Sequence, residues 1–206
     1  MTSDIQKPRT PTQKRGIKTK KKIVDAAMRV FSEKGFHTTN TKEIAKEAGI
    51  SIGSFYAYFK DKKSVFLEIY KGFSHSPLSD IGKIAADSGG EQTAAEKVTT
   101  LLRALFDGHG LSPDFQREVS YMRYSDSDVQ ALHNTIHKNL HRQVVEALEA
   151  QKESLRITDI EAAAFVILCA CEEVIHNSNI TDHGMDSDRL LAGLADMLAR
   201  FLYKNS

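Results

Sequence analysis

Residues 40–62 read NTKEIAKEAGISIGSFYAYFKDK, and the fold and function expected of the whole chain start from this stretch. Asn40 can cap a short helix, and Glu43 stands three residues later, which is the spacing of a capping box. Gly49 then predicts a tight turn, after which Ser51 can cap a second short helix. Two short helices joined by a short turn are typical of a helix-turn-helix.

The second helix of this pair has two different faces. Phe55 and Phe59 lie four residues apart, so both can anchor the helix in a core. Small and polar side chains remain for the other face, and Gly53 has no side chain where a backbone could approach a phosphate. A solvated helix seldom carries so many aromatic residues unless a partner covers part of it. The groups that could face a DNA groove are Ser51, Ile52, Ser54, Tyr56 and Tyr58.

The rest of the chain also shows helical periodicity. An amphipathic pattern begins at Ile17 and stops at Gly35, which predicts a supporting helix before the pair. Asp61 can cap a further helix. No stretch alternates at period two, so the chain is predicted to be all-α, with about nine to ten helices. The later helices are expected near 77–87, 92–107, 113–123, 127–153, 158–177 and 186–204.

Charge is distributed unevenly along the chain. Residues 1–63 contain fifteen Lys and Arg against six Asp and Glu, whereas residues 64–206 contain thirteen against twenty-one. A nucleic-acid-binding head on an acidic body has this pattern, although a solvated basic tail would give it too. Residues 1–16, with Pro8 and Pro11, are interpreted as a flexible basic arm.

Several classes of protein are disfavoured. No apolar run approaches the ~20 residues that span a bilayer, so no membrane association is expected. Cys169 and Cys171 point to different sides of a helix, which argues against a disulfide and favours a reducing, cytoplasmic location. The chain lacks a nucleophile elbow, a phosphate loop and a dinucleotide fingerprint, so we expect no enzyme and no cofactor.

Residues 23–69 resemble the DNA-binding domain of the TetR family of transcriptional regulators. The resemblance lies in residue types and spacing over roughly fifty consecutive positions, about a quarter of the chain. Its elements are Ala26-Ala27 and Phe31, Glu33-Lys34-Gly35-Phe36, Thr39 through Ala45, Ala48-Gly49-Ile50-Ser51 with Gly53, and Tyr56, Tyr58, Phe59 and Lys62.

The resemblance implies roles for individual residues. Thr41, Tyr56 and Tyr58 match positions that bind phosphates, and Lys62 would pair with another phosphate. Ile52 is apolar where many members have a polar residue, and contact with a thymine methyl is one use for it. Ala57 is small, so base recognition is expected to depend on few direct contacts and partly on DNA shape. The expected DNA-binding residues are Thr41, Lys42, Ser51, Ile52, Gly53, Ser54, Tyr56, Tyr58 and Lys62.

The resemblance also implies a function and partners. The expected protein is a homodimeric repressor that binds a palindromic operator in double-stranded DNA and is released by a small-molecule effector. An activator of the same family remains open, as does a helical interaction module that does not bind DNA. A DNA-binding domain is expected over 17–76, followed by an effector-binding and dimerisation domain over 77–206.

Sites in the second domain are predicted from helical periodicity and the resemblance together. For each set, an ordinary core inside one chain is the alternative. The residues expected to line an effector pocket are Phe106, Phe115, Val119, Met122, Arg123, Ile136, Phe165, Glu172 and His176. Those expected at a dimer interface, on the last two helices, are Phe165, Leu168, Leu191, Leu194, Leu198 and Phe201.

Three histidines raise the question of a metal. His133, His137 and His141 follow one another at four-residue steps, and two histidines at this spacing can chelate one ion. Three span about 12 Å, so one ion can take at most two of them. Lys138 and Arg142 indicate a solvated face. Cys169, Cys171 and His176 form a looser group of candidate metal ligands. The simpler interpretation is that the two cysteines are buried structural residues. No metal site is therefore expected.

Overall fold

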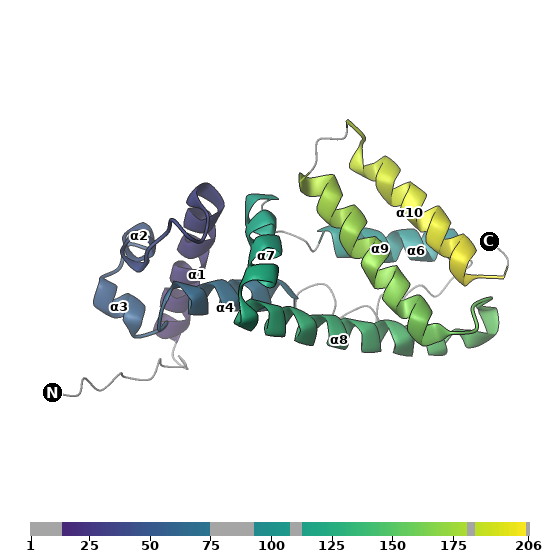
Figure 1. Ribbon diagram of the computed structural model, residues 1–206, viewed down its shortest axis with the longest axis horizontal. Helices are drawn as coiled ribbons and strands as arrows, with labels where there is room; N and C mark the ends of the chain where they lie inside the picture. Colours follow the sequence, from purple (N-terminus) through teal and green to yellow (C-terminus); the bar gives the residue numbers. More distant parts are fainter. Residues whose placement is uncertain (1–13, 75–92, 108–112, 181–183, 205–206) are drawn as a thin grey trace. The chain divides into compact units, whose positions relative to one another are not determined.

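The computed structural model describes residues 14–74, 93–107, 113–180 and 184–204. These residues form helices and one isolated bridge, between Leu155 and Tyr203, which confirms the all-α prediction (Figure 1). The expected helix near 77–87 and most of the expected basic arm lie outside the described residues. The elements are α1 (Lys14–Lys34), α2 (Thr41–Glu47), α3 (Ile52–Tyr56), α4 (Lys62–Ser74), α6 (Ala94–Asp107), α7 (Pro113–Ser125), α8 (Ser127–Glu149), the 3-10 turn η2 (Lys152–Ser154), α9 (Ile160–Ile180) and α10 (Ser187–Leu202).

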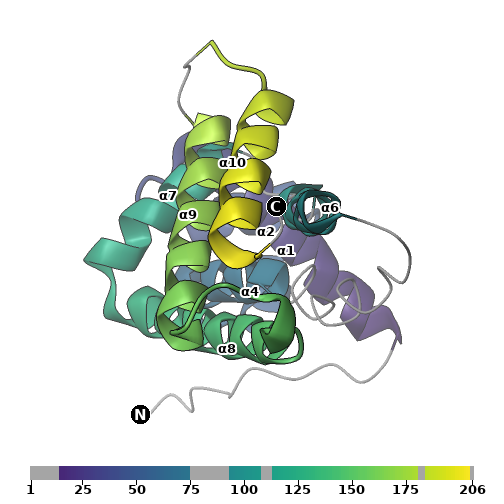
Figure 2. The same cartoon turned by 90° about the vertical axis from the view of Figure 1, so that its right-hand side faces the viewer.

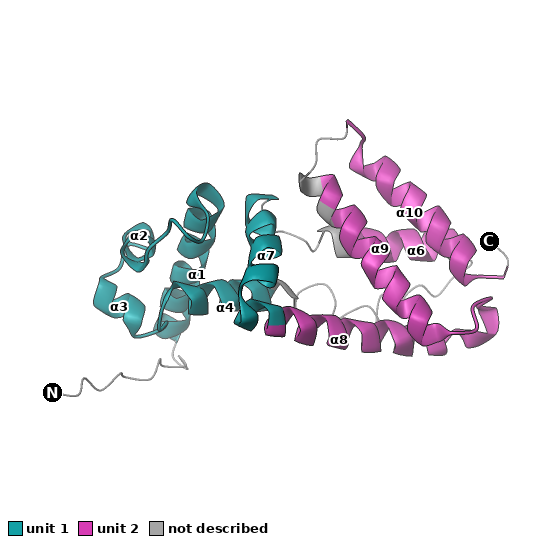
Figure 3. Cartoon of the chain, in the orientation of Figure 1, with its two compact units in different colours: residues 1–72, 111–130 teal, residues 73–110, 131–206 magenta. Residues whose placement is uncertain are grey.

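The described residues divide into two compact units. Unit 1 comprises the described residues within 1–72 and 111–130, and unit 2 comprises those within 73–110 and 131–206 (Figure 3). This division differs from the linear boundary expected after residue 76, because α7 belongs with the N-terminal helices. α1 also begins at Lys14, inside the segment expected to be a flexible arm.

Unit 1 is built around phenylalanine rings from different parts of the chain. Phe31 of α1 lies edge-on to Phe66 of α4, with ring centroids 5.8 Å apart. Phe115 of α7 lies 5.1 Å from Phe66, and all three side chains are fully buried. Aromatic side chains bury large areas and favour such tilted pairs. The position of Phe115 explains why α7 is part of this unit.

Unit 2 packs α6, α9 and α10 together; Figure 2 shows α9 and α10 side by side, with α6 next to α10. Its core contains Val98 and Leu102 of α6, Cys171 and Ile175 of α9, and four residues of α10. A second cluster includes Leu148, Leu155, Ile160 and Leu202. None of the described helices is long and apolar enough to cross a membrane.

Helix α8 is shorter than the 127–153 helix expected from the sequence. It ends at Glu149, and the chain turns through η2 so that buried Leu155 can join the second cluster. The turned segment pairs with the end of the chain, since Arg156 N–H donates to the Leu202 carbonyl at 2.8 Å. Long-range packing ends this helix earlier than local periodicity predicts.

Candidate nucleic-acid interface

Helix α2 begins with the predicted capping box. The Asn40 side chain accepts hydrogen bonds from the N–H groups of Lys42 and Glu43, and the Glu43 carboxylate accepts one from Asn40 N–H at 3.0 Å. The Lys34 ammonium and the Asn40 N–H hold the pKa of Glu43 below its usual range. The box fixes where α2 starts, because it satisfies N–H groups that lack partners within the helix.

The turn and the start of α3 also follow the sequence. Gly49 has a φ of +66°, a conformation that side chains disfavour. Ser51 caps α3 by accepting a hydrogen bond from Ser54 N–H at 3.1 Å. These local contacts set α3 at a defined angle to α2, as a helix-turn-helix requires.

The two faces of α3 separate as predicted. Phe55 is fully buried and Phe59, just beyond the helix, is nearly so. By contrast, Ile52 is 38% exposed and Tyr56 is 49% exposed. A short helix that buries its phenylalanines and exposes an isoleucine and a tyrosine can present the second pair to another molecule.

A hydroxyl pair joins the exposed edges of α2 and α3. The Thr41 side-chain oxygen lies 3.1 Å from the Tyr56 hydroxyl, within hydrogen-bond distance. We define the recognition edge as Thr41, Lys42, Ser51, Ile52, Gly53, Ser54 and Tyr56. Within it Thr41 and Ser54 are half-buried and the others are exposed, while Tyr58, the remaining predicted member on this helix-turn-helix, is half-buried.

Lys62, expected to bind phosphate, is engaged inside unit 1. Its ammonium donates to the backbone carbonyls of Phe36, His37 and Thr39 at 2.7, 3.1 and 2.7 Å. A lysine has three N–H donors, so these contacts use all of them. Burial lowers the pKa of the ammonium, and the Glu43 carboxylate opposes this change. In this conformation Lys62 stabilises the turn after α1, and the expected phosphate contact would require it to leave these carbonyls.

Glu118 of α7 has a role that sequence reasoning missed. Its carboxylate accepts a hydrogen bond from Phe36 N–H at 2.8 Å, just after Gly35 ends α1 with a φ of +79°. No local signal connects a carboxylate to an N–H group 82 residues earlier. The predicted helix stop at Gly35 is confirmed, and Glu118 satisfies the backbone group that follows it.

The structure distributes the predicted effector-pocket residues over both units. Phe115 and Met122 are buried in unit 1, where Val119 and Arg123 also lie, and Arg123 stacks on Tyr124. Unit 2 contains Ile136, Phe165 and Glu172, and of these Phe165 is exposed. The side chains of Phe106 and His176 lie outside the described part of the chain. The seven described residues therefore do not form one group within either unit.

The predicted dimer-interface residues also separate. Leu191, Leu194 and Leu198 are buried in the core of unit 2, where Val98 and Leu102 of the same chain pack in the same cluster. Leu168 is half-buried. Phe165 and Phe201, at 56% and 38%, are exposed. The leucines thus serve the chain's own core, and the two phenylalanines remain available to a partner.

Comparison with known proteins finds a family match in both the N-terminal and the C-terminal part of the chain. The family described as "Bacterial regulatory proteins, tetR family" matches residues 23–69, and "Tetracyclin repressor-like, C-terminal domain" matches residues 93–202. The chain is similar to the HTH-type transcriptional regulator AcrR of Shigella flexneri, with 42% identity over 70 residues, 34% of this chain and 32% of that protein. The fatty acid metabolism regulator protein of Bacillus subtilis is 32% identical over 84 residues, 41% of this chain and 42% of that protein. The matched stretches thus span less than half the length of these relatives.

Solved structures share the fold over most of the chain. The fatty acid degradation regulator FadR from Bacillus halodurans superposes with a TM-score of 0.69 at 22% identity, covering 94% of this chain and 97% of that one. A transcriptional regulator from Saccharomonospora viridis in complex with choline gives a TM-score of 0.72 at 16% identity, covering 92% and 100%. At such identities the likeness concerns the fold alone. The second family match covers more than half of the residues of this chain. This chain therefore belongs to the TetR family of bacterial transcriptional regulators.

Proposed function

We propose that this protein is a sequence-specific DNA-binding repressor that inserts α3 into the major groove of an operator. The observation that carries the proposal is the recognition edge, backed by buried Phe55 and Phe59. A major groove about 12 Å wide admits one helix and displays a distinct pattern for each base pair. Ile52 suits a thymine methyl group, and Ser51 and Ser54 suit polar base edges or phosphates.

Phosphate contacts hold the head on the duplex. The adjacent hydroxyls of Thr41 and Tyr56 form a pair of donors suited to phosphate oxygens. Lys42, Lys46 and Lys60 add exposed positive charge on and beside the recognition edge. Such charges give affinity that falls steeply with salt but carry no sequence information.

We further propose a homodimer that reads a palindromic operator, since one such head covers one half-site. Exposed apolar faces on α9 and α10 support it. On α9, Ala162, Phe165, Val166 and Cys169 are all exposed and recur at helical spacing. On α10, Gly193, Met197 and Phe201 lie at four-residue steps, and an added Cβ at Gly193 would meet open space. Large exposed apolar side chains on neighbouring helices mark protein interfaces.

A small-molecule effector in unit 2 would release the operator by binding the DNA-free dimer more tightly than the DNA-bound one. The predicted pocket residues Ile136 and Glu172 remain candidates for contact with it. Such a repressor acts where its operator lies, so we propose a cytoplasmic protein.

The DNA proposal is tested by selecting genomic fragments with the purified full chain and measuring affinity for a selected duplex by fluorescence anisotropy. Tyr56→Phe removes one hydroxyl and is expected to weaken binding about tenfold. Lys42→Glu is expected to weaken it further and to reduce its salt dependence. Lys138→Glu, at an exposed position of α8, makes the same change in net charge and serves as the control. Equal losses for both lysine variants, or no preference for any duplex at low salt, would contradict the proposal.

The mode of regulation needs a second measurement. A repressor is expected to lower transcription from a promoter that contains the selected fragment, and an effector is expected to restore it. A rise in transcription on adding the protein would identify an activator.

The dimer is tested by sedimentation of the full chain and its variants. Phe165→Glu together with Phe201→Glu is expected to give a monomer, because burying two carboxylates in an apolar interface is costly. Ile17→Glu, at a comparably exposed apolar residue of α1, is the matched control and should sediment as the unaltered chain does. A chain that is monomeric before substitution would overturn the dimer.

A further inference from the structure

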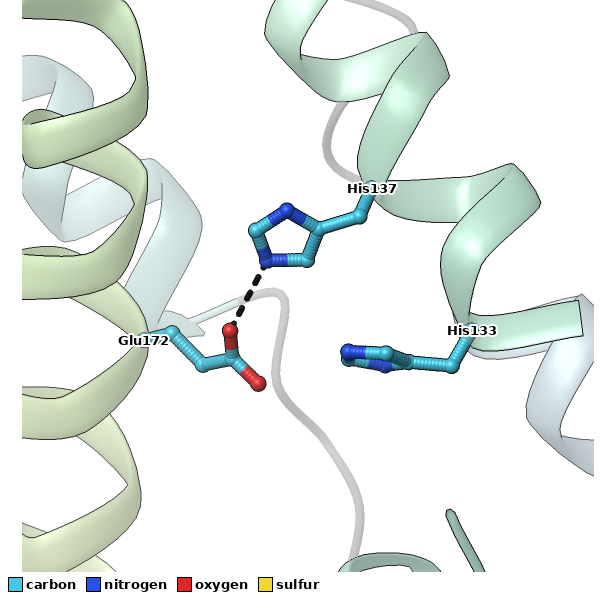
Figure 4. Close-up of side chains that lie close together, drawn as sticks. All are labelled: His133, His137 and Glu172. Carbon is cyan, nitrogen blue, oxygen red and sulfur yellow. Dashed lines mark hydrogen bonds and ion pairs between the residues drawn. The ribbon is translucent and has the colours of Figure 1, made fainter. Parts of the chain in front are cut away.

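Two histidines of α8 and one glutamate of α9 converge within unit 2 (Figure 4). His133 and His137 project from successive turns of α8, and Glu172 faces them from α9. One ligand atom from each lies within 4.8 Å of the other two, and all three side chains are half-buried. The sequence pattern had grouped the first two with His141, whereas the fold groups them with a carboxylate.

We propose that His133, His137 and Glu172 form a binding site for a divalent transition-metal ion of the Zn²⁺ type. Imidazole nitrogens and carboxylate oxygens are zinc ligands at about 2.0–2.2 Å, so a tetrahedral site spaces them by about 3.3 Å. The His137 Nε2 and the nearer Glu172 oxygen are 2.9 Å apart. Side-chain rotation has to bring the remaining atoms closer by at most about 1.5 Å from their present separation.

The second imidazole distinguishes this group from an ordinary contact between helices. Beside the contact between His137 and Glu172, the His133 ring lies with its centroid 5.2 Å from that of His137. Histidines four residues apart on one helical face form a chelate whose geometry the helix holds in advance. The carboxylate across the gap supplies the third ligand and makes the site bridge α8 and α9.

Next along α8, His141 provides an internal comparison. Its Nε2 lies 2.9 Å from the Glu161 backbone carbonyl and 3.5 Å from the carboxylate of the same residue. His141 therefore also faces α9 and an acidic residue, but it is not part of a three-residue group in the described chain. If one histidine beside one glutamate were sufficient for metal binding, His141 with Glu161 would bind an ion as well as the three-residue group does.

Three protein ligands leave a fourth position open on zinc. The site would therefore take water or an oxygen or nitrogen donor from a small molecule as its last ligand. The half-buried state of the three side chains leaves a route for such a ligand from solvent. The two imidazoles would bind the ion through their ring nitrogens in the neutral form.

The test titrates Zn²⁺ against a chromogenic chelator in the tag-free full chain. One ion per chain is expected. His133→Gln, His137→Gln and Glu172→Gln should each weaken binding at least about 100-fold, since loss of an outer partner already costs 10–100-fold. His141→Gln should leave the affinity unchanged. Equal weakening by His141→Gln, or a full-strength site in the three variants, would overturn the proposal.

Cobalt substitution gives a second readout. Bound Co²⁺ is expected to show the intense visible bands of four-coordination without a sulfur-to-metal charge-transfer band. A charge-transfer band would assign the metal to Cys169 or Cys171 and overturn the site. Glu172→Gln keeps the shape of its side chain, so its loss of metal would not come from unfolding. The experiment uses no DNA, and its failure would leave the proposed repressor intact.

Discussion

The carboxylate of Glu118 accepts a hydrogen bond from the backbone N–H of Phe36, with 2.8 Å between oxygen and nitrogen. This bond connects α7 to the turn that leads from α1 into the helix-turn-helix. The Phe36 ring packs against Phe31 and Phe66, with centroids 5.5 and 5.3 Å apart. A helix distant in sequence thus holds the segment that enters α2, so the unit that contains the helix-turn-helix also includes part of the C-terminal half of the chain.

Replacing Glu118 with alanine is expected to destabilise unit 1. The Phe36 N–H would lose its partner in a partly buried position, which costs about 1–3 kcal/mol. Glu118→Gln keeps an acceptor oxygen and should cost less. Urea unfolding of the full chain, followed by circular dichroism, measures the difference. The exposed Glu33→Ala is the control, and a loss as large as that of Glu118→Ala would remove the hydrogen bond as the explanation.

Two glycines allow the same contact to be tested by sterics. Gly35 and Gly49 have φ angles of +79° and +66°, so alanine at either is expected to cost roughly 1–2 kcal/mol in backbone strain. A Cβ at Gly35 would also lie 3.0 Å from a Glu118 carboxylate oxygen, whereas one at Gly49 would meet nothing within 4 Å.

Gly35→Ala should therefore reduce the free energy of unfolding more than Gly49→Ala does. In a Glu118→Ala background the two losses should become similar, because the conflicting carboxylate is gone. If the extra cost at Gly35 persists without Glu118, its cause lies in the backbone and not in the contact.

The sequence was most informative where structure is local. The Asn40–Glu43 capping box and the Phe55–Phe59 pair involve residues three and four positions apart, and both were predicted. Gly35 was predicted as a helix stop for the same reason. Such features depend on neighbouring residues, and helix geometry alone fixes which of these meet.

Contacts between distant segments could not be predicted in this way. Periodicity identified Leu194 and Leu198 as an apolar face, but not that α6 of the same chain covers it. It grouped His141 with two other histidines, although packing of α9 brings Glu172 to them instead. The family resemblance implied that Lys62 binds phosphate, and nothing in the sequence shows its three carbonyl partners.

Removing the positive charge is expected to lower stability at Lys62 and to change DNA binding at Lys42. Lys62→Met leaves three carbonyls without their donor and should lower the free energy of unfolding by about 1–3 kcal/mol. Lys42→Ala, at an exposed position on α2, should leave stability unchanged and reduce the slope of log affinity against log salt by about 1. Thermal unfolding and anisotropy titrations at several salt concentrations measure the two effects. If Lys62→Met instead reduced the salt dependence of DNA binding and Lys42→Ala instead lowered stability, the result would show that Lys62 leaves its carbonyls to bind DNA.

Acid is expected to weaken the start of α2. The Lys34 ammonium, followed by the Asn40 N–H, holds the pKa of Glu43 below its ordinary 4.5 in the folded chain. A carboxyl whose pKa is lower in the folded state stabilises that state above its ordinary pKa, and this contribution is lost as pH falls through the folded value. Glu43→Gln should therefore flatten the dependence of the urea midpoint on pH from about 6 to about 3. The exposed Glu146→Gln is the control, and an unchanged pH profile in Glu43→Gln would contradict the assignment.

The two cysteines report on the proposed dimer from within α9. Burial raises the pKa of the Cys171 thiol to about 12, so it should react slowly with maleimide in any folded form. Cys169 is exposed in the single chain and lies one helical turn after Phe165, on the face proposed to meet the partner. It should react slowly in the dimer and quickly after Phe165→Glu with Phe201→Glu, and mass spectrometry of time points would identify the modified residue. Cys169 lies so close to Phe165 that an interface around Phe165 would also cover the thiol. If Cys169 reacts at the same rate in the unaltered chain and in the double variant, another surface therefore holds the dimer together.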